Sequence, residues 1–320
     1  MRWNVSFKDI KGNDAVISFL IESSATGRVA NAYIFSGPDG IGKKLSALAF
    51  AKAINCLSPN EGVSCDKCPS CKKIDSSNHP DVFIVAPEKK GTTIKIDDIR
   101  VVIKDNGLKP YEAKVKVYII DEADGLTDEA ANALLKTLEE PSMASMLILI
   151  TERPSRLLPT IRSRCQIVNF FPLDAAMVEE ILTASHNIDG VKARLLGRIS
   201  CGSPGRALEL EDNDFFDKRE RIIKALSSDT FSYLDFDKTP RSDLRAILNI
   251  MLTWYRDIMV MKAGDGKLMN VDKKELISTE ADRIGFEKLD NVLKRIMLTQ
   301  TYLDQSANPK LAITALGLAL

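Results

Sequence analysis

The chain has 320 residues with 45% hydrophobic and 28% charged side chains, and its 44 Lys and Arg residues balance 44 Asp and Glu residues. This length is enough for two or three domains, each with its own core. The neutral balance argues against a protein that binds DNA on its own, because such proteins usually carry a clear basic excess. No apolar segment approaches the roughly 18 residues of a membrane span, and the first residues lack a signal-peptide core. We therefore expect a cytoplasmic protein whose thiols stay reduced.

Short apolar segments alternate with helical patterns in the first half of the chain. The expected strands cover residues 32–35, 82–86, 114–121, 147–150 and 166–170, and the expected helices cover residues 14–24, 42–55, 96–104 and 127–139. Thr127 can cap the last of these helices, and Pro141 can stop it. Strands that alternate with helices form mostly parallel sheets, with ligands at the carboxyl ends of the strands. This half therefore predicts an α/β domain at residues 1–170 with a parallel five-stranded sheet.

Only helical patterns follow residue 172. The expected helices cover residues 175–184, 191–200, 204–210, 241–262, 286–302 and 309–320. Between two groups of these helices, the polar residues 211–214 have the composition of a linker. We therefore expect a small helical domain at residues 171–211 and an all-helical C-terminal domain at residues 212–320.

A glycine-rich segment between the first strand and its helix has the spacing of a phosphate-binding P-loop. Gly37, Gly40 and Gly42 allow the tight backbone that cradles phosphate, and Lys43 occupies the position of the P-loop lysine. The pattern fails at its last position, where Lys44 replaces the hydroxyl that ligates Mg²⁺. The segment predicts a phosphate-binding loop with a compromised metal site, and its alternative is an ordinary glycine turn before a helix.

The third expected strand ends in the acidic pair of a Walker B motif. Asp121 can hold Mg²⁺ through water, and Glu122 can orient the attacking water. The alternative is that this acidic pair only caps the next helix. Thr151 ends the fourth strand and is expected to face the phosphates beside Asp121, although a strand-end hydroxyl can also serve the backbone alone.

Four cysteines with short spacings form a candidate metal centre. They follow the pattern C-x8-C-x2-C-x2-C, at Cys56, Cys65, Cys68 and Cys71. Four thiolates can close a tetrahedral Zn²⁺ site, and full coordination by sulfur indicates a structural zinc rather than a catalytic one. We therefore expect a zinc module at residues 56–71, with reduced free thiols as the main alternative and disulfides as a lesser one.

Three arginines lie near the ends of the predicted elements. Arg162 and Arg164 come just before the last strand, and Arg206 lies in the first turn of a helix. A cation is unfavourable at a helix N-terminus, so Arg206 has a weak indication of a partner. The alternative for all three is ordinary solvated surface charge.

Together these motifs resemble the AAA+ subunits of the bacterial clamp loader of the DNA polymerase III holoenzyme. The resemblance covers residues 7–210 closely and the helical remainder by length and character. The matching stretches are Phe35-Ser-Gly-Pro38 with the P-loop, the four cysteines, Asp121-Glu-Ala-Asp124, Ala130-Ala-Asn-Ala-Leu-Leu-Lys-Thr-Leu-Glu-Glu-Pro141, Ser163-Arg-Cys165 and Gly202-Ser-Pro-Gly205. The segment at residues 130–141, joined to Ser-Arg-Cys, is highly specific to this family.

The resemblance implies a P-loop AAA+ domain, a helical lid and a C-terminal collar that joins a hetero-pentamer. In such proteins Arg164 acts as an arginine finger on a neighbouring subunit's ATP, and Thr151 and Arg206 match the two sensor positions. The implied partners are other loader subunits, delta and gamma/tau, with the sliding clamp and primed DNA reached through the complex. No membrane partner is implied.

Within this family, the degraded P-loop at Lys44 and the chain's end at Leu320 without a long tail indicate a delta-prime subunit. A unit charge about 4 Å from a dication costs about 8 kcal/mol at an effective dielectric constant of 20. We expect the flexible Lys44 side chain to relieve that repulsion by swinging away. Binding of ATP with Mg²⁺ then remains open, and hydrolysis should be poor. The alternatives are an ATP-hydrolysing motor subunit of the gamma/tau type and a zinc-dependent nucleic-acid-binding module outside replication.

Overall fold

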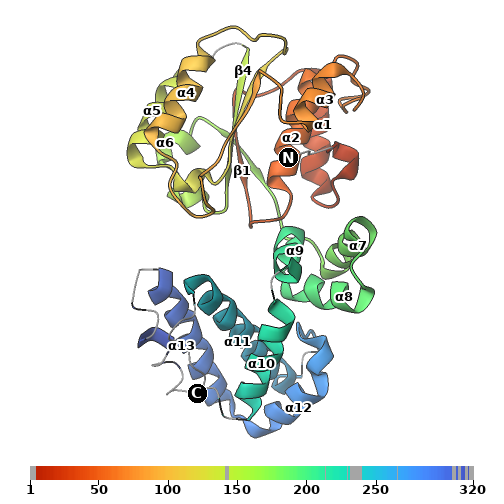
Figure 1. Ribbon diagram of the computed structural model, residues 1–320, viewed down its shortest axis with the longest axis vertical. Helices are drawn as coiled ribbons and strands as arrows, with labels where there is room; N and C mark the ends of the chain where they lie inside the picture. The colour runs from red at the N-terminus through yellow and green to blue at the C-terminus, as the bar shows by residue number, and fades with distance from the viewer. Residues whose placement is uncertain are drawn as a thin grey trace. The chain divides into compact units, whose positions relative to one another are not determined.

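The computed structural model describes residues 5–140, 144–212, 214–228, 230, 240–264, 266–304, 308, 311–313 and 316. The chain divides into two compact units (Figure 1). The first unit contains residues 1–177 and 202–205, and the second contains residues 178–201 and 206–320. The three domains expected from the sequence stay a prediction, because this division addresses compactness alone.

A parallel five-stranded sheet forms the centre of the first unit, as the sequence predicts. Its strands are β1 (Ala32–Ser36), β2 (Val82–Val85), β3 (Lys116–Ile120), β4 (Ser145–Thr151) and β5 (Gln166–Asn169). Their order is β2-β3-β4-β1-β5, and every neighbouring pair is parallel. The observed ends differ slightly from the expected ones, and β4 for example begins at Ser145 rather than residue 147.

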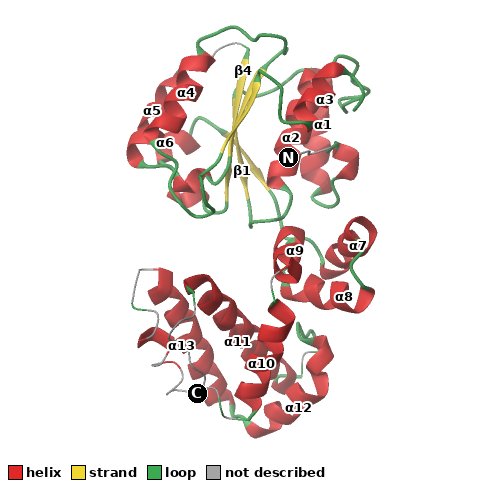
Figure 2. Ribbon diagram, viewed as in Figure 1, coloured by secondary structure: helices red, strands yellow, loops and turns green. Residues whose placement is uncertain are grey.

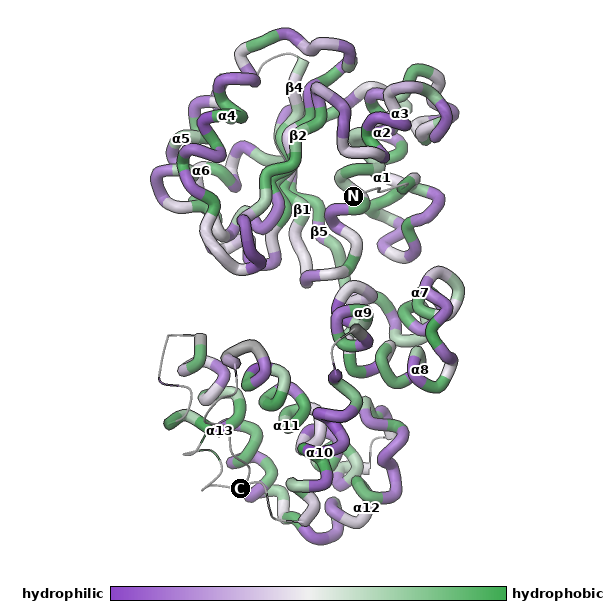
Figure 3. Tube along the Cα trace, viewed as in Figure 1, coloured by the Kyte–Doolittle hydropathy of each residue, from purple (hydrophilic) through white to green (hydrophobic). Residues whose placement is uncertain are grey.

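Helices cover both faces of this sheet (Figure 2). These helices are α1 (Asp14–Thr26), α2 (Lys43–Asn55), α3 (Pro69–Asp75), α4 (Ile96–Asn106), α5 (Asp128–Glu139) and α6 (Pro159–Arg162). Strand residues alternate between two separate cores, so that Tyr33 packs edge-to-face on Phe50 of α2 while Ile34 faces the core that contains Leu134 of α5. A sheet buried on both faces needs apolar residues on both sides of each strand, and the strands are accordingly hydrophobic (Figure 3).

Thr127 caps α5 as expected. Its side chain accepts a hydrogen bond of 3.3 Å from the backbone N–H of Ala130, which satisfies one of the free donors at the helix start. Asp128 and Glu129 add negative charge in the first turn, where the helix dipole favours it. The expected stop at Pro141 lies outside the described residues.

The second unit is entirely helical in its described part. Its elements are α8 (Gly190–Ile199), α10 (Phe215–Ser227), α11 (Arg241–Lys262), α12 (Lys274–Arg283), α13 (Phe286–Asp304) and parts of α7 (Ala175–His186) and α9 (Pro204–Asp212). The bounds of α11 match the expected ones, and Trp254 at its centre is buried in the core. The linker expected at residues 211–214 begins too early, because α9 continues through Asp212. Most of the helix expected at residues 309–320 lies outside the described residues.

The sequence did not predict α3, the single-turn α6, α10 or α12. The short α3 lies inside the cysteine segment, and α10 and α12 are rich in charge, which obscures their apolar stripes. Among the described helices, each is too short or too polar to cross a bilayer.

A buried carboxylate fixes the segment between α11 and α12. Asp257 of α11 is fully buried and accepts hydrogen bonds from the backbone N–H groups of Met269 and Asn270 and from the Asn270 side chain. Arg219 of α10 then donates to the side-chain oxygen of Asn270 and pairs with Asp272 at 2.7 Å. Because these groups are buried away from water, their mutual hydrogen bonds are costly to break.

We predict that Asp257→Asn lowers the free energy of unfolding by about 3 kcal/mol, since the amide directs N–H groups at backbone donors and leaves buried groups unsatisfied. Urea unfolding followed by far-UV circular dichroism measures this change. The exposed Asp282→Asn is the matched control and should change stability by less than about 0.5 kcal/mol. Equal stability of both variants would contradict the role assigned to Asp257.

Candidate nucleotide and metal sites

The carboxyl ends of three neighbouring strands bring the predicted nucleotide motifs together. The P-loop follows β1, Asp121 follows β3, and Thr151 ends β4, which lies between them. The register pairs Ser36 with Thr151, and the backbone N–H of Gly37 donates to the Thr151 carbonyl at 3.2 Å. The residues expected to form the site therefore lie together at the carboxyl ends of the strands.

The P-loop has the backbone that its glycines predict. Gly37 has φ of 150°, and a side chain there would collide with the carbonyl oxygen of Phe170. Gly42 has φ of 97° and turns the chain directly into α2. Both positions require glycine, as the P-loop pattern predicts, and phosphate binding by this segment stays a prediction.

Lys43 is held by the loop that it follows. Its ammonium donates to the carbonyl oxygens of Gly37 and Pro38, each at 2.6 Å, and the residue is 5% exposed. Burial lowers the pKa of Lys43, and attraction to nearby carboxylates, first that of Asp39 and then that of Glu152, partly opposes this shift. The P-loop cation is thus present but engaged with backbone oxygens.

Lys44 stands at the last position of the P-loop pattern, where a hydroxyl that ligates Mg²⁺ is expected. The expected movement of this side chain away from a bound Mg²⁺ stays a prediction. In the structure, the Nζ of Lys44 lies 2.9 Å from Oδ2 of Asp121. The physical reason is direct attraction, because the ammonium and the Walker B carboxylate are both partly shielded from water, with side chains 30% and 20% exposed. The carboxylate that would serve Mg²⁺ is thereby paired with a protein cation.

The carboxylate of Glu122 is also hydrogen-bonded within the protein. Its backbone is left-handed, with φ of 50°, and its Oε2 accepts a hydrogen bond of 2.8 Å from the backbone N–H of Gly91. The loop after β2 therefore holds the group that was expected to orient water. A left-handed non-glycine residue is uncommon, and here it directs the side chain toward that loop.

Thr151 is buried and tied to an acidic residue that the sequence had not assigned. Its hydroxyl donates to Oδ1 of Asp124 at 2.8 Å and accepts from the backbone N–H of Arg153 at 3.0 Å. These two bonds satisfy the hydroxyl within the protein, and its expected role toward phosphates stays a prediction. The sequence Asp121-Glu-Ala-Asp124 offered a signal for this contact, because its last residue is a second carboxylate close to the end of β3.

The Gly202–Gly205 motif packs directly against the P-loop. Ser203 Oγ donates to the carbonyl oxygen of Asp39 at 2.7 Å, and the Gly205 N–H donates to the carbonyl oxygen of Gly40 at 2.9 Å. A side chain at Gly205 would come within 2.7 Å of the Gly40 Cα. Small residues in this motif are therefore required for close backbone approach.

Acidic residues surround the phosphate loop. Asp39 on the loop itself pairs with Lys90 at 2.6 Å, and burial together with the charges of Asp39 and Asp124 raises the pKa of Glu152. Carboxylates this close oppose a polyanionic ligand, because like charges repel most strongly where water is excluded. The negative charges of Asp39 and Asp121 are thus paired with Lys90 and Lys44 of the same chain.

The four cysteines converge as predicted. Their sulfur atoms all lie within 4.8 Å of one another, and Cys56 and Cys71 are buried. A tetrahedral Zn²⁺ with Zn–S bonds near 2.3 Å places its sulfurs about 3.8 Å apart, so the cluster fits this ion. Backbone N–H groups of Lys67 and Cys68 lower the pKa of Cys65 to about 6, whereas burial raises the pKa of Cys56 and of Cys71.

A buried lysine attaches the cysteine module to the P-loop helix. Lys52 of α2 is 1% exposed, and its ammonium contacts Asp66 at 2.8 Å and Asp75 at 2.7 Å. It also donates to the carbonyl oxygen of Val5 at 3.1 Å. Asp66 lies between Cys65 and Cys68, so the loop of the cluster and the helix of the P-loop share one ion-pair network.

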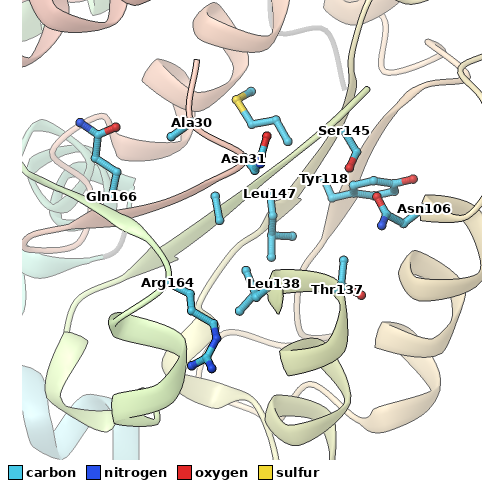
Figure 4. Close-up of a pocket in the computed structure, with 12 residues that line it drawn as sticks. Ala30, Asn31, Asn106, Tyr118, Thr137, Leu138, Ser145, Leu147, Arg164 and Gln166 are labelled. Atoms are coloured by element: carbon cyan, nitrogen blue, oxygen red, sulfur yellow. The ribbon is translucent and has the colours of Figure 1, made fainter. Parts of the chain in front are cut away.

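Arg164 lies near the amino ends of the strands, whereas the P-loop lies at their carboxyl ends. It precedes β5, and because β1 and β5 are parallel, the phosphate loop lies beyond the other end of these strands. Its guanidinium contacts Glu139 at 2.8 Å and the Thr160 carbonyl oxygen at 2.9 Å. It lines a pocket of about 170 Å³ at the amino ends of the strands, together with Asn106 and Ser145 (Figure 4). Arg164 is therefore remote from its own nucleotide site.

Arg206 belongs to the second compact unit, at the start of α9. Its expected sensor role stays a prediction. It lines a pocket of about 370 Å³ within that unit, together with Glu209, Phe215 and Asp243.

We predict that Lys44→Thr strengthens Mg²⁺-dependent ATP binding by about ten-fold or more, because it removes the ammonium from Asp121 and adds a hydroxyl ligand. Isothermal titration calorimetry with Mg²⁺ and with EDTA measures the effect. Lys44→Met removes the ammonium without adding a ligand and should gain less. No gain with threonine would mean that other contacts close the site.

We predict close to one zinc ion per chain by elemental analysis of protein purified without chelator. Cys71→Ser should lose the metal and loosen the first unit without unfolding the helices of the second, because the cluster lies in the first unit. Cys201→Ser, outside the cluster, is the control and should retain the metal. Four freely titrating thiols and no metal in the wild-type protein would contradict this prediction.

Two family models together match most of this chain. A family model described as "DNA polymerase III, delta subunit" matches residues 12–174, and one described as "DNA polymerase III, delta subunit, C terminal" matches residues 213–320. The delta-prime subunit of DNA polymerase III from Bacillus subtilis is 33% identical over 307 residues, which cover 92% of this chain and 91% of that protein. The Escherichia coli delta-prime subunit is 32% identical over 281 residues, covering 86% and 83%.

Relatives named tau or gamma/tau subunits are matched over a smaller share of their own length. The Escherichia coli tau subunit of DNA polymerase III is 34% identical over 212 residues, which cover 65% of this chain and 32% of that protein. The two delta-prime relatives described above are instead matched over most of their own length as well as most of this chain. The chain belongs to the DNA polymerase III delta-subunit family, on the delta-prime side of it.

Proposed function

We propose that this chain is a delta-prime-type subunit of the DNA polymerase III clamp loader that supplies Arg164 to a neighbouring subunit's ATP. It assembles with delta and gamma/tau-type subunits in a cytoplasmic hetero-pentamer that places the sliding clamp on primed DNA. The observation that carries this proposal is the position of Arg164, at the sheet edge opposite its own P-loop. A guanidinium in that place can serve only a nucleotide held by another chain.

The state of the chain's own nucleotide site supports an assembly role rather than a motor role. Lys44 is paired with Asp121, and Glu122 is held by the Gly91 N–H. Hydrolysis needs a dication on the first carboxylate and an oriented water at the second. Both requirements compete with existing contacts, so ATP with Mg²⁺ binds weakly at most and is hydrolysed poorly.

The chemistry of the arginine supports action in trans. A guanidinium is always charged and presents planar donors that match phosphate oxygens. It can stabilise the charge that accumulates on these oxygens in the transition state of phosphoryl transfer. The Arg164 side chain is 36% exposed, which leaves it accessible to a neighbouring chain.

The cysteine module has a structural role in this proposal. Cys56, Cys65, Cys68 and Cys71 fill all four positions of a tetrahedral zinc site and leave none for a substrate. Lys52 links this module to α2, so the metal stabilises the domain that carries the P-loop. A zinc-dependent nucleic-acid-binding role finds less support, because the chain has a neutral charge balance.

We predict that Arg164→Ala lowers the DNA- and clamp-stimulated ATPase of the assembled loader by about ten-fold or more, and clamp loading with it. Arginine fingers supplied in trans contribute about 10³ to 10⁵ in rate in small GTPases, so an effect of this size is a conservative expectation. Steady-state ATPase assays on the reconstituted assembly measure it. Lysine should rescue poorly, because a point charge lacks the fork of the guanidinium.

Arg156→Ala is the control, since Arg156 is an exposed arginine of the same domain. Folding, zinc content and assembly should be intact in both variants. Wild-type turnover by the Arg164→Ala assembly would refute the role in trans. Loss of assembly would instead make Arg164 an interface residue with a structural role.

A further inference from the structure

Glu139 stands at an unfavourable position in its helix. It is the last residue of α5, where the negative end of the helix dipole disfavours a carboxylate. Its Oε1 lies 2.8 Å from Nη2 of Arg164. Because the dipole opposes the charge of Glu139, this arginine is the interaction that compensates it.

Two helices hold the Arg164 guanidinium from different directions. Nη2 contacts Glu139 at the end of α5, and Nη1 donates to the carbonyl oxygen of Thr160 in α6 at 2.9 Å. Arg164 and Leu138, the residue before Glu139, line the same pocket (Figure 4). Two contacts to the two terminal nitrogens of one planar guanidinium restrict both its position and its orientation.

These two contacts use two of the five N–H donors that a guanidinium carries. The second N–H of each terminal nitrogen and the Nε–H remain as donors toward another ligand. The two side chains are 36% and 49% exposed, so the ion pair is screened by water and does not cancel the charge of the arginine. The guanidinium can therefore meet a phosphate while it is still anchored.

We propose that Glu139 is a positioning residue that presents Arg164 to the nucleotide of the neighbouring subunit. This inference rests on the proposed function, because it concerns the same arginine. An unanchored arginine must lose its rotamer freedom when it meets the phosphate, and that loss weakens the interaction in the transition state. Glu139 orders the side chain beforehand, so that less freedom is lost on contact.

The test is Glu139→Gln in the assembled loader, alone and together with Arg164→Ala. Glutamine keeps the size of the side chain and removes its charge. We expect kcat of the stimulated ATPase to fall about three- to five-fold with KM for ATP unchanged, because the neighbour's own residues bind the nucleotide. In the Arg164→Ala background the second substitution should cause no further loss.

Glu140→Gln is the matched control, with the same change one residue further along the chain. It should leave kcat, KM and Tm at their wild-type values, and Glu139→Gln should also leave Tm unchanged. In the isolated chain, the NMR order parameter of the Arg164 Nε–Hε group should fall in Glu139→Gln and not in Glu140→Gln. This readout is independent of ATPase activity.

The outcomes separate the two claims. Wild-type or faster turnover of Glu139→Gln, or an equal loss in the Arg164→Ala background, overturns the positioning role and leaves the function of Arg164 standing. Wild-type turnover of Arg164→Ala itself overturns the proposed function, and the role of Glu139 is overturned with it. An unchanged order parameter shows that Glu139 does not order the side chain, which also overturns the inference.

Discussion

The common direction of the five strands is the constraint on which the rest of the first unit depends. In a parallel sheet all carboxyl ends lie at one edge and all amino ends at the other. Residues that follow strands, such as Gly37 and Asp121, must then meet at one edge, and a residue that precedes a strand, such as Arg164, must lie at the other. The fold itself thus separates the chain's phosphate loop from its candidate arginine finger, and this separation suits action between subunits.

The phosphate loop keeps its backbone although its ligand contacts are replaced by contacts within the protein. Lys44 takes the carboxylate that a dication would use, and Thr151 donates to Asp124. The loop remains useful to the fold for another reason, since Gly205 packs on Gly40 and fixes the start of α9 there. This packing gives the loop a structural role that does not depend on nucleotide chemistry.

The cysteine module and the P-loop helix α2 are joined by one ion-pair network. Lys52 is almost fully buried, so its charge needs both Asp66, which belongs to the module, and Asp75, which ends α3 just after it. Zinc would hold the loop on which Asp66 lies, and Asp66 in turn neutralises a charge on α2. Metal binding and the order of the P-loop helix are therefore coupled through one ion-pair network.

Sequence patterns predicted the features that depend on neighbouring residues: the five strands, the Thr127 cap, the bounds of α11 and the convergence of the four cysteines. Local patterns suffice for these because periodicity, capping and ligand spacing all act over a few residues. The partners of the charged groups became known only from the folded chain. Lys44 meets Asp121, and Asp257 holds the segment before α12, through contacts that join distant parts of the chain. A charged side chain is flexible and pairs with whatever the fold brings near it, so its partner follows from packing and not from its own sequence neighbourhood.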